Sequence, residues 1–208
     1  MRKFVFLMLT ILFSVASSLA QTEKKFELFG GYTFENIDSG IRSEDIGTNT
    51  TLDNRFNANG FRVAATGYFT KHIGITGDFS AHFDNRNDVF DSTTGESKFR
   101  LYNFTGGPQF RFINTTRFTP FVQTLAGIAR RNLSESFSGN GTDVTDDKTS
   151  FALKLGGGVD YKLSDRFSLR IFQMNYNPVF LRSRIVDGFT VPDRTLNGFE
   201  FSTGIVIK

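Results

Sequence analysis

Apolar residues recur at every second position along most of this chain. In the segment Ile73–Phe83, isoleucine, phenylalanine, alanine and glycine alternate with polar residues over eleven positions. A helix would repeat its apolar residues about every 3.6 positions, whereas alternation is the pattern of a strand with two unlike faces. The same alternation appears in six segments, which are residues 26–34, 61–69, 73–83, 102–112, 151–161 and 199–207. The chain is therefore predicted to be all-β.

Two further segments complete a set of eight strands but follow the rule less cleanly. In Pro120–Ala129, Val122 and Ile128 lie on one alternating face while Phe121 and Leu125 lie on the other, so either face could be apolar. In Phe167–Phe180 the apolar set changes face. An extra residue in one strand shifts its alternation by one position, so the sequence predicts a β-bulge near Phe172–Gln173.

The polar face of these strands carries charges of both signs, at Glu27, Arg62, Asp78, Arg111, Lys154, Asp160, Arg170 and Glu200. It also carries many glycines. Alternation alone fits a soluble barrel with an apolar interior or a membrane barrel with an apolar exterior. Small residues suit the crowded interior of a barrel of about eight strands. We therefore expect the polar face to line the lumen, where the eight charged residues would form a network of ion pairs.

The connections between these segments alternate in length without exception. The long ones are Ile37–Ala58, Asp84–Ser97, Asn132–Thr149 and Leu181–Arg194, and the short ones are Thr70–His72, Ile113–Arg117 and Lys162–Arg166. Membrane barrels have short turns on one side and long loops on the other. The predicted fold is an eight-stranded antiparallel up-and-down transmembrane β-barrel that occupies residues 21–208.

The first twenty residues have the features of an export signal. Arg2 and Lys3 precede an apolar run, and Ser18-Leu19-Ala20 is a small-x-small cleavage motif. We expect residues 1–20 to be a cleaved secretory signal peptide, because the apolar run is short for a membrane-spanning helix. Export predicts a location in the outer membrane of a Gram-negative cell, with periplasmic termini and extracellular long loops.

Charge and cysteine content exclude several classes of protein. The chain has 24 basic and 21 acidic residues, and loss of Arg2 and Lys3 with the signal leaves 22 basic residues. This balance is unlike the clustered basic surface of a nucleic-acid-binding protein. The absence of cysteine excludes disulfides and thiolate metal sites.

Several segments are similar to the eight-stranded outer-membrane barrels of the OmpA, OmpX and opacity-protein type. They are Phe26–Tyr32, Phe104–Phe112, Pro120–Gly127 and the glycine-rich run with its short turn at Gly156–Arg170. The resemblance covers essentially the whole mature chain and implies outer-membrane lipid and the barrel-assembly machinery as partners. Such barrels usually end in an aromatic residue that this machinery reads, whereas this chain ends in Ile207-Lys208.

Little in the sequence points to catalysis or to a bound cofactor. His82 with Ser80 and Asp84 is the one local set that resembles a Ser–His–acid arrangement, and a polar lumen lining is the favoured explanation for it. The acidic stretch Asp84–Asp88 with Asp91, and the group Asp143, Asp146 and Asp147, lack the order of a calcium loop. We predict no enzymatic activity, no cofactor and no metal site.

Three functions remain open at this stage. The first is a structural or surface-interaction protein with a largely plugged lumen and four outer loops, which would present a site for a surface ligand. The second is a small porin-like channel for ions or solutes. The third is an enzyme that modifies outer-leaflet lipid through His82. A soluble ligand-binding barrel is the alternative to all three.

Overall fold

The computed structural model describes residues 26–38, 55–90, 93–137, 144–181, 184–186, 189–191 and 193–208. The predicted signal peptide, residues 1–20, lies outside this part. Ten strands are present: β1 (Phe26–Asp38), β2 (Arg55–Tyr68), β3 (Ile73–Phe90), β4 (Thr93–Arg111), β5 (Phe118–Phe137), β6 (Val144–Lys162), β7 (Phe167–Leu181), β8 (Arg184–Val186), β9 (Phe189–Val191) and β10 (Arg194–Ile207). No helix in the described ranges is long and apolar enough to cross a membrane.

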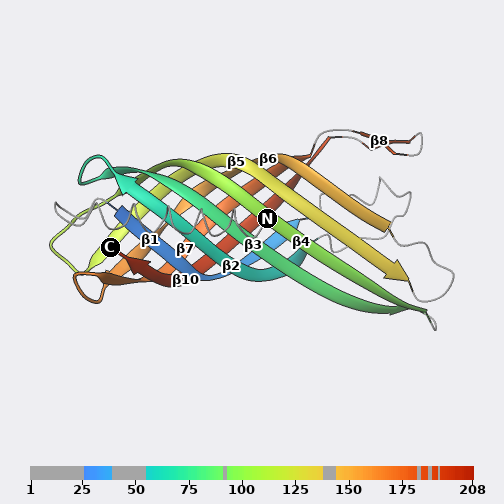
Figure 1. The fold of residues 1–208 in the computed structure, drawn as a ribbon, viewed down its shortest axis with the longest axis horizontal. Coiled ribbons are helices and arrows are strands. Elements are labelled where there is room, and N and C mark those ends of the chain that lie inside the picture. The colour runs from blue at the N-terminus through green and yellow to red at the C-terminus, as the bar shows by residue number, and fades with distance from the viewer. Residues whose placement is uncertain are drawn as a thin grey trace, which may run out of the picture.

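Eight of these strands close into one antiparallel barrel in the order β1-β10-β7-β6-β5-β4-β3-β2 (Figure 1). Each strand pairs with its neighbour along the chain, and β1 pairs with β10 to close the ring, with Gly31 opposite Gly204. The two remaining strands, β8 and β9, form a short separate hairpin between β7 and β10. This arrangement confirms the predicted eight-stranded up-and-down barrel.

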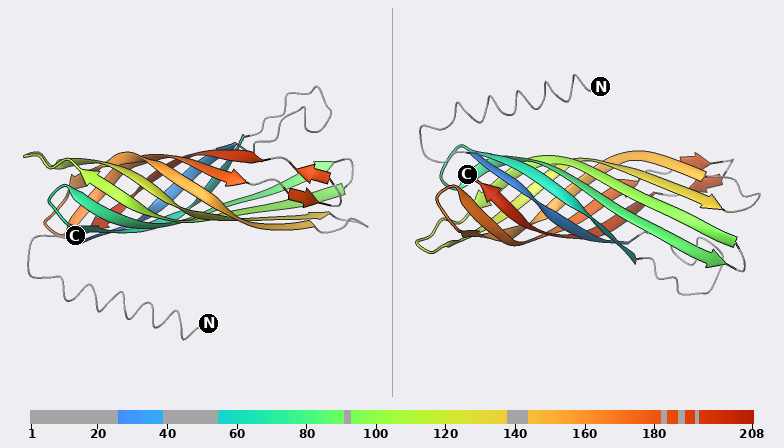
Figure 2. Two further views of the ribbon diagram at one scale, coloured as in Figure 1. Left: turned by 90° about the horizontal axis from the view of Figure 1, so that it is seen from above. Right: turned by 60° about the horizontal axis from the view of Figure 1, so that its bottom comes forward.

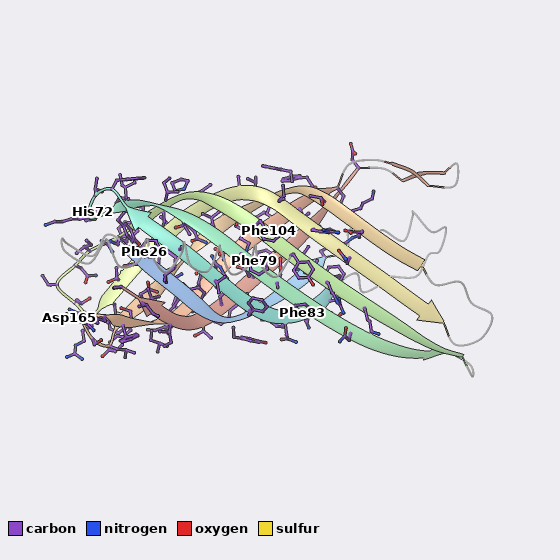
Figure 3. The ribbon with its side chains drawn as sticks, viewed as in Figure 1. Phe26, His72, Phe79, Phe83, Phe104 and Asp165 are labelled. Carbon is purple, nitrogen blue, oxygen red and sulfur yellow. The ribbon has the colours of Figure 1, made fainter. Side chains whose placement is uncertain are left out.

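The apolar face of the strands is the outer surface of the barrel. Val63, Phe104 and Ile128 are each about half exposed, and Figure 3 shows Phe79, Phe83 and Phe104 on the outside of neighbouring strands. Rings also contact one another across strands, as in the Phe79–Phe104 pair, whose centroids are 4.7 Å apart. In β5, Val122 is 49% exposed while Phe121 is buried at 3%, which settles the face that the sequence left open.

The predicted irregularity in β7 is a β-bulge. Val159 pairs with Phe172 but the next residue, Asp160, pairs with Arg170, so β7 contains one residue more than β6 at this point. On the other side of β7, the pairs Ser202–Gln173 and Gly204–Arg170 show the same shift. Ile171 and Phe172 consequently both face outward, at 41% and 39% exposure. The prediction of a bulge near Phe172–Gln173 is confirmed.

Strands β3, β4, β5 and β6 are 18 to 20 residues long, compared with 13 to 15 for the other four barrel strands. Since about 9–11 residues cross a membrane at the usual tilt, the four longer strands extend well beyond it. They project as a sheet from one end of the barrel (Figures 1 and 2). The prediction that Asp84–Ser97 and Asn132–Thr149 are long loops is wrong for most of their residues, because cross-strand pairing continues there.

Deletion of one residue tests the bulge. Deleting Phe172 would remove the extra residue of β7 and leave Arg170 and Gln173 facing the lumen as they do now. We expect this variant to fold, with a loss of stability of about 1.5–3 kcal/mol from the missing Phe side chain. Folding is measured as heat-modifiable migration on a detergent gel.

Deleting Phe104 is the matched control, because β4 has no spare residue and one end of the strand would exchange its faces. We expect that variant not to form the fast-migrating barrel. Equal failure of the two deletions would contradict the role assigned to the bulge.

Candidate functional site

The centre of the lumen holds a group of four fully buried charged side chains, contributed by β2, β3, β6 and β10. Arg62 Nε lies 2.5 Å from Asp78 Oδ2 and Arg62 Nη1 lies 3.3 Å from Glu200 Oε1. Lys154 Nζ donates to Asp78 Oδ1 at 2.9 Å, to Glu200 Oε2 at 2.8 Å and to the Ser80 hydroxyl at 2.8 Å. All four side chains are 0% exposed. Each charge therefore has an opposite charge in direct contact, as burial requires.

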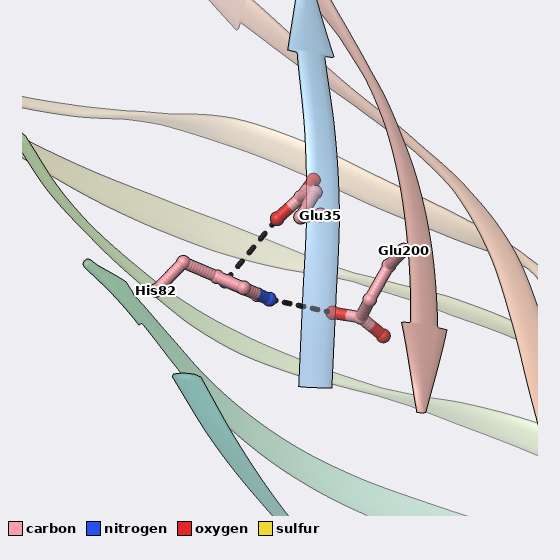
Figure 4. Close-up of side chains that lie close together, drawn as sticks. All are labelled: Glu35, His82 and Glu200. Carbon is pink, nitrogen blue, oxygen red and sulfur yellow. Dashed lines mark ion pairs between the residues drawn. The ribbon is translucent and has the colours of Figure 1, made fainter. Parts of the chain in front are cut away.

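Glu35 on β1 and His82 on β3 contact this central group (Figure 4). His82 Nδ1 lies 3.1 Å from Glu35 Oε2, and His82 Nε2 lies 3.6 Å from Glu200 Oε2. Asn177 donates to the other Glu35 oxygen at 2.7 Å. The group then contains two permanent cations, three carboxylates and one imidazole, so it would be neutral with one proton bound to Glu35 or to His82.

Gly198 leaves the space that Glu35 occupies. A Cβ atom on Gly198 would lie 2.0 Å from Glu35 Oε1, a distance at which the carboxylate would have to move. The glycine-rich polar face noted in the sequence thus has a local explanation here, because a residue with no side chain on β10 makes room for a charged one on β1.

Glu35, His82 and Glu200 are also the set of side chains in the described ranges that could hold a metal ion, since their ligand atoms lie within 4.8 Å of one another. Glu200 fits this role poorly. Its Oε2 is bonded to Lys154 and its Oε1 accepts from Asn175 at 2.8 Å. A divalent cation would have to displace the Lys154 ammonium, so the arrangement favours a proton over a metal.

A second group lies nearer the short-turn end of the barrel. Arg170 forms a two-pronged ion pair with Asp160, with donor–acceptor distances of 2.7 and 3.0 Å. The rings of Phe29 and Phe121 lie 4.5 and 4.2 Å from the guanidinium carbon. Gln173 accepts a further hydrogen bond from Arg170 at 2.8 Å. This Arg is held on its edge by a carboxylate and on its flat faces by aromatic rings.

A third group occupies the mouth of the barrel at the short-turn end. Arg111 Nη1 lies 2.8 Å from Glu27 Oε1, and Lys208 Nζ lies 3.7 Å from the same oxygen. Tyr68 donates to Glu27 Oε2 at 3.1 Å. The Arg111 and Lys208 side chains are each 14% exposed, so this group is in contact with solvent.

Toward the projecting sheet, the lumen is filled by apolar side chains instead. The cluster consists of Ile37, Ala58, Phe99, Leu101, Ala129, Ala152, Val179, Leu181 and Leu196, all buried, with Phe56 packed against it. The rings of Phe56 and Phe99 meet edge to face with centroids 4.6 Å apart. An apolar layer therefore covers the central charged group on the side opposite the short turns.

The eight charged residues predicted from the sequence lie in three groups of ion pairs, and hydrogen bonds through Gln173 and Asn175 link the Arg170 group to Glu200. Sequence reasoning left out Glu35, although it lies on the same alternating face as Glu27. It also missed the apolar layer. The signal for that layer was present, because Ile37, Leu101 and Val179 continue the lumen-facing positions of their strands beyond the last charged residue.

The arrangement that resembled a catalytic triad is not formed. The Ser80 hydroxyl accepts hydrogen bonds from Lys154 and, at 3.3 Å, from Asn103, while His82 lies against Glu35 and Glu200. Asp84–Asp88 belongs to β3 and pairs with β4, so it is an extended strand and not a loop around an ion. Asp147 pairs with Arg130, and Asp91 and Asp143 lie outside the described residues.

Comparison with known proteins places this geometry in a family. A family model described as an outer membrane protein β-barrel domain matches residues 5–180. A comparison with curated protein sequences found no match.

Two solved structures share the fold at low sequence identity. One is the attachment invasion locus protein Ail of Yersinia pestis, in complex with the heparin analogue sucrose octasulfate. It has 19% identity over 87% of this chain and 97% of that chain, with a TM-score of 0.54. The other is Neisserial surface protein A, with 15% identity over 88% and 97% and a TM-score of 0.55. The resemblance noted in the sequence is confirmed, and the chain belongs to the outer membrane protein β-barrel domain family.

Proposed function

We propose that this protein is a surface-interaction barrel of the outer membrane. Its sealed lumen makes the barrel a rigid support for the sheet that β3–β6 form beyond the end of the barrel. The observation that carries this proposal is the projecting sheet, which has two strand edges without a partner in the described chain. The long-strand end then faces the cell exterior, with both termini in the periplasm after removal of residues 1–20. Outer-membrane lipid surrounds the barrel, and the barrel-assembly machinery inserts it.

The packing of the lumen favours a structural, supporting role for the barrel over a role in transport. The central side chains, among them Arg62, Lys154 and His82, are completely buried. The apolar layer above them includes Ile37 and Leu101, each 1% exposed. A conducting path for ions would have to break several buried ion pairs and then cross an apolar layer, and both steps are costly. The same burial separates His82 from any lipid substrate, so we propose no catalytic role.

The projecting sheet has two open edges. β3 pairs with β2 only as far as Phe83, although its pairing with β4 continues to Phe90. β6 pairs with β7 only from Phe151 onward, although its pairing with β5 begins at Val144. Residues 85–90 and 144–146 therefore present backbone N–H and C=O groups on one side without a neighbouring strand among the described residues. Such edges accept an extended segment of another chain as an added strand.

The charges of the sheet favour recognition through the backbone over recognition of a polyanion. Its four segments contain six basic residues, Arg86, Lys98, Arg100, Arg130, Arg131 and Lys148, and six acidic ones, Asp84, Asp88, Glu96, Glu135, Asp146 and Asp147. The structurally similar Ail was solved with a sulfated heparin analogue, and a surface for a polyanion of that kind generally has an excess of positive charge. We propose that this chain instead binds an extended protein segment, with no nucleic acid as a partner.

Shortening the sheet tests this function. Replacing residues 85–97 and 133–147 by two-residue turns removes both open edges and leaves the barrel pairs below them intact. Cells that display the natural protein are expected to attach to immobilised extracellular-matrix proteins, and cells that display the shortened variant are not. Heat-modifiable migration of the variant would show that the barrel itself is folded. Equal attachment by the two proteins would contradict the proposal.

Replacing Lys154 tests the sealed core. In Lys154→Met, the carboxylates of Asp78 and Glu200 would lose the cation that they share, and a broken buried pair costs about 3–5 kcal/mol. Lys162→Met is the matched control, because the Lys162–Asp165 pair is exposed and such pairs contribute about 0–1 kcal/mol. The free energy of unfolding in urea measures both. Similar losses in the two variants would show that water reaches the central group.

A further inference from the structure

The outer wall of the barrel carries a groove that none of the roles above uses. It crosses four neighbouring strands, β1, β10, β7 and β6, and has a volume of about 390 Å³. A volume of this size is in the range of small-molecule sites. Most of its lining is apolar or aromatic and consists of Phe34, Leu155, Met174, Tyr176, Phe199 and Phe201.

The groove lies on the lipid-facing surface and not in the lumen. Met174 and Phe199 are 56% and 52% exposed, like other outward residues of the wall. Asn175 and Glu200 also line the groove, but their side chains are buried in the lumen, so it is their backbone that reaches the outer surface. The groove is therefore continuous with the surface by which a barrel of this family contacts lipid.

A row of carboxamide side chains borders the groove at the end nearer the projecting sheet. Asn36 lines the groove directly and donates to Asn57 Oδ1 at 2.7 Å. The Tyr176 hydroxyl donates to Asn197 Oδ1 at 2.6 Å. These hydrogen bonds join β1 to β2 and β7 to β10, so the polar row follows the same strands as the groove beneath it.

This row marks the edge of the apolar band on the outer wall. Along β1 the outward residue changes from Phe34 to Asn36, and along β10 it changes from Phe199 to Asn197. A tyrosine with an apolar ring and a hydrogen-bonded hydroxyl is typical of the membrane–water interface, and Tyr176 has this form. The groove therefore lies just inside the hydrocarbon region, with the carboxamides at the depth of the lipid head groups.

The carboxamides offer neutral hydrogen-bonding groups to a head group at this depth. Asn57 and Asn197 each accept a hydrogen bond through the side-chain oxygen, while their Nδ2 groups donate to no residue in the described part of the chain. An amide nitrogen of this kind supplies two donors, and the hydroxyl groups of a sugar can accept from it and donate in turn. Arg55 also contacts the row, but its Nε donates to Asn36 Oδ1 at 2.5 Å.

We propose that this groove binds one acyl chain of a glycolipid, whose sugar head group accepts hydrogen bonds from Asn57 and Asn197. The occupant is a lipid because the groove is continuous with the membrane-facing wall, and its head group is a sugar because the bordering groups are carboxamides. Placement of the groove in the outer leaflet rests on the orientation proposed above. Binding itself does not, so a failure of cell attachment would leave this inference standing.

The test is native mass spectrometry of the full protein released from phosphatidylcholine nanodiscs. The nanodiscs contain equal small amounts of a glucosyl diacylglycerol and of phosphatidylglycerol with the same acyl chains. We expect the glycolipid to be retained about fivefold more often, the effect of one or two net hydrogen bonds, and the preference to disappear in the double variant Asn57→Ala/Asn197→Ala. Equal retention of both lipids by the natural protein, or an undiminished preference in the double variant, would overturn the proposal.

A bulky side chain in the groove tests the place of the acyl chain. Met174→Trp fills part of the groove, so we expect retention of the glycolipid to fall by at least about fivefold. Ile75→Trp is the matched control, because Ile75 is a similarly exposed lipid-facing residue on β3, away from the groove, and retention should be unchanged.

Heat-modifiable migration verifies that both tryptophan variants are folded. Equal retention of the glycolipid by Met174→Trp and Ile75→Trp would contradict the proposed site. A lipid-free dimer of the natural protein in place of a lipid-bound monomer would also overturn it, because a second copy of the chain would then cover the groove.

Discussion

Closure of the strand ring is the constraint on which the rest of this structure depends. The β1–β10 pairs join the ends of the chain and leave the barrel wall without an open edge within the membrane-crossing region. Eight strands enclose a lumen only wide enough for side chains, so one alternating face of every strand must pack against the others. In lipid the opposite face must be apolar, because no water is present there to solvate it. The positions of the charged residues follow from these two requirements.

Within that narrow lumen, charge balance determines which side chains lie together. Lys154 contacts two carboxylates and a hydroxyl, and Arg62 contacts the same two carboxylates from β2. Arg170 is satisfied separately by Asp160 and two aromatic rings. Toward the short turns, Arg111 and Glu27 form a partly exposed ion pair. The lumen is thus filled at its centre by buried ion pairs and meets solvent at its short-turn end.

The sequence predicts the barrel well because the fold follows from a local pattern, the alternation of apolar and polar residues. Alternation and the shift of face after Ile171 each depend on neighbouring residues, and the structure confirms both. Whether Phe121 or Val122 faces the lumen could not be predicted from neighbouring residues in β5. It depends on which face of β5 meets the aromatic and charged side chains of β1 and β7 across the lumen.

The site was predictable only in part, for a related reason. Whether a residue lies on the polar face follows from its position in the alternation, so Glu35 could have been included among the predicted lumen charges. Its contact with His82 depends on the register and tilt of strands far apart in the chain. The length of β3–β6 was underestimated because polar residues outside the membrane tolerate either strand or loop, and cross-strand pairing between distant segments decides between them.

The central claim is that the lumen is sealed by its own side chains. Ion conductance across a planar bilayer tests it most directly, with insertion of folded protein verified by heat-modifiable migration of the recovered sample. The structure predicts no steady unitary conductance, because buried ion pairs and the apolar layer around Ile37 and Leu101 close the path. Reproducible channels of constant conductance from the folded protein would contradict it.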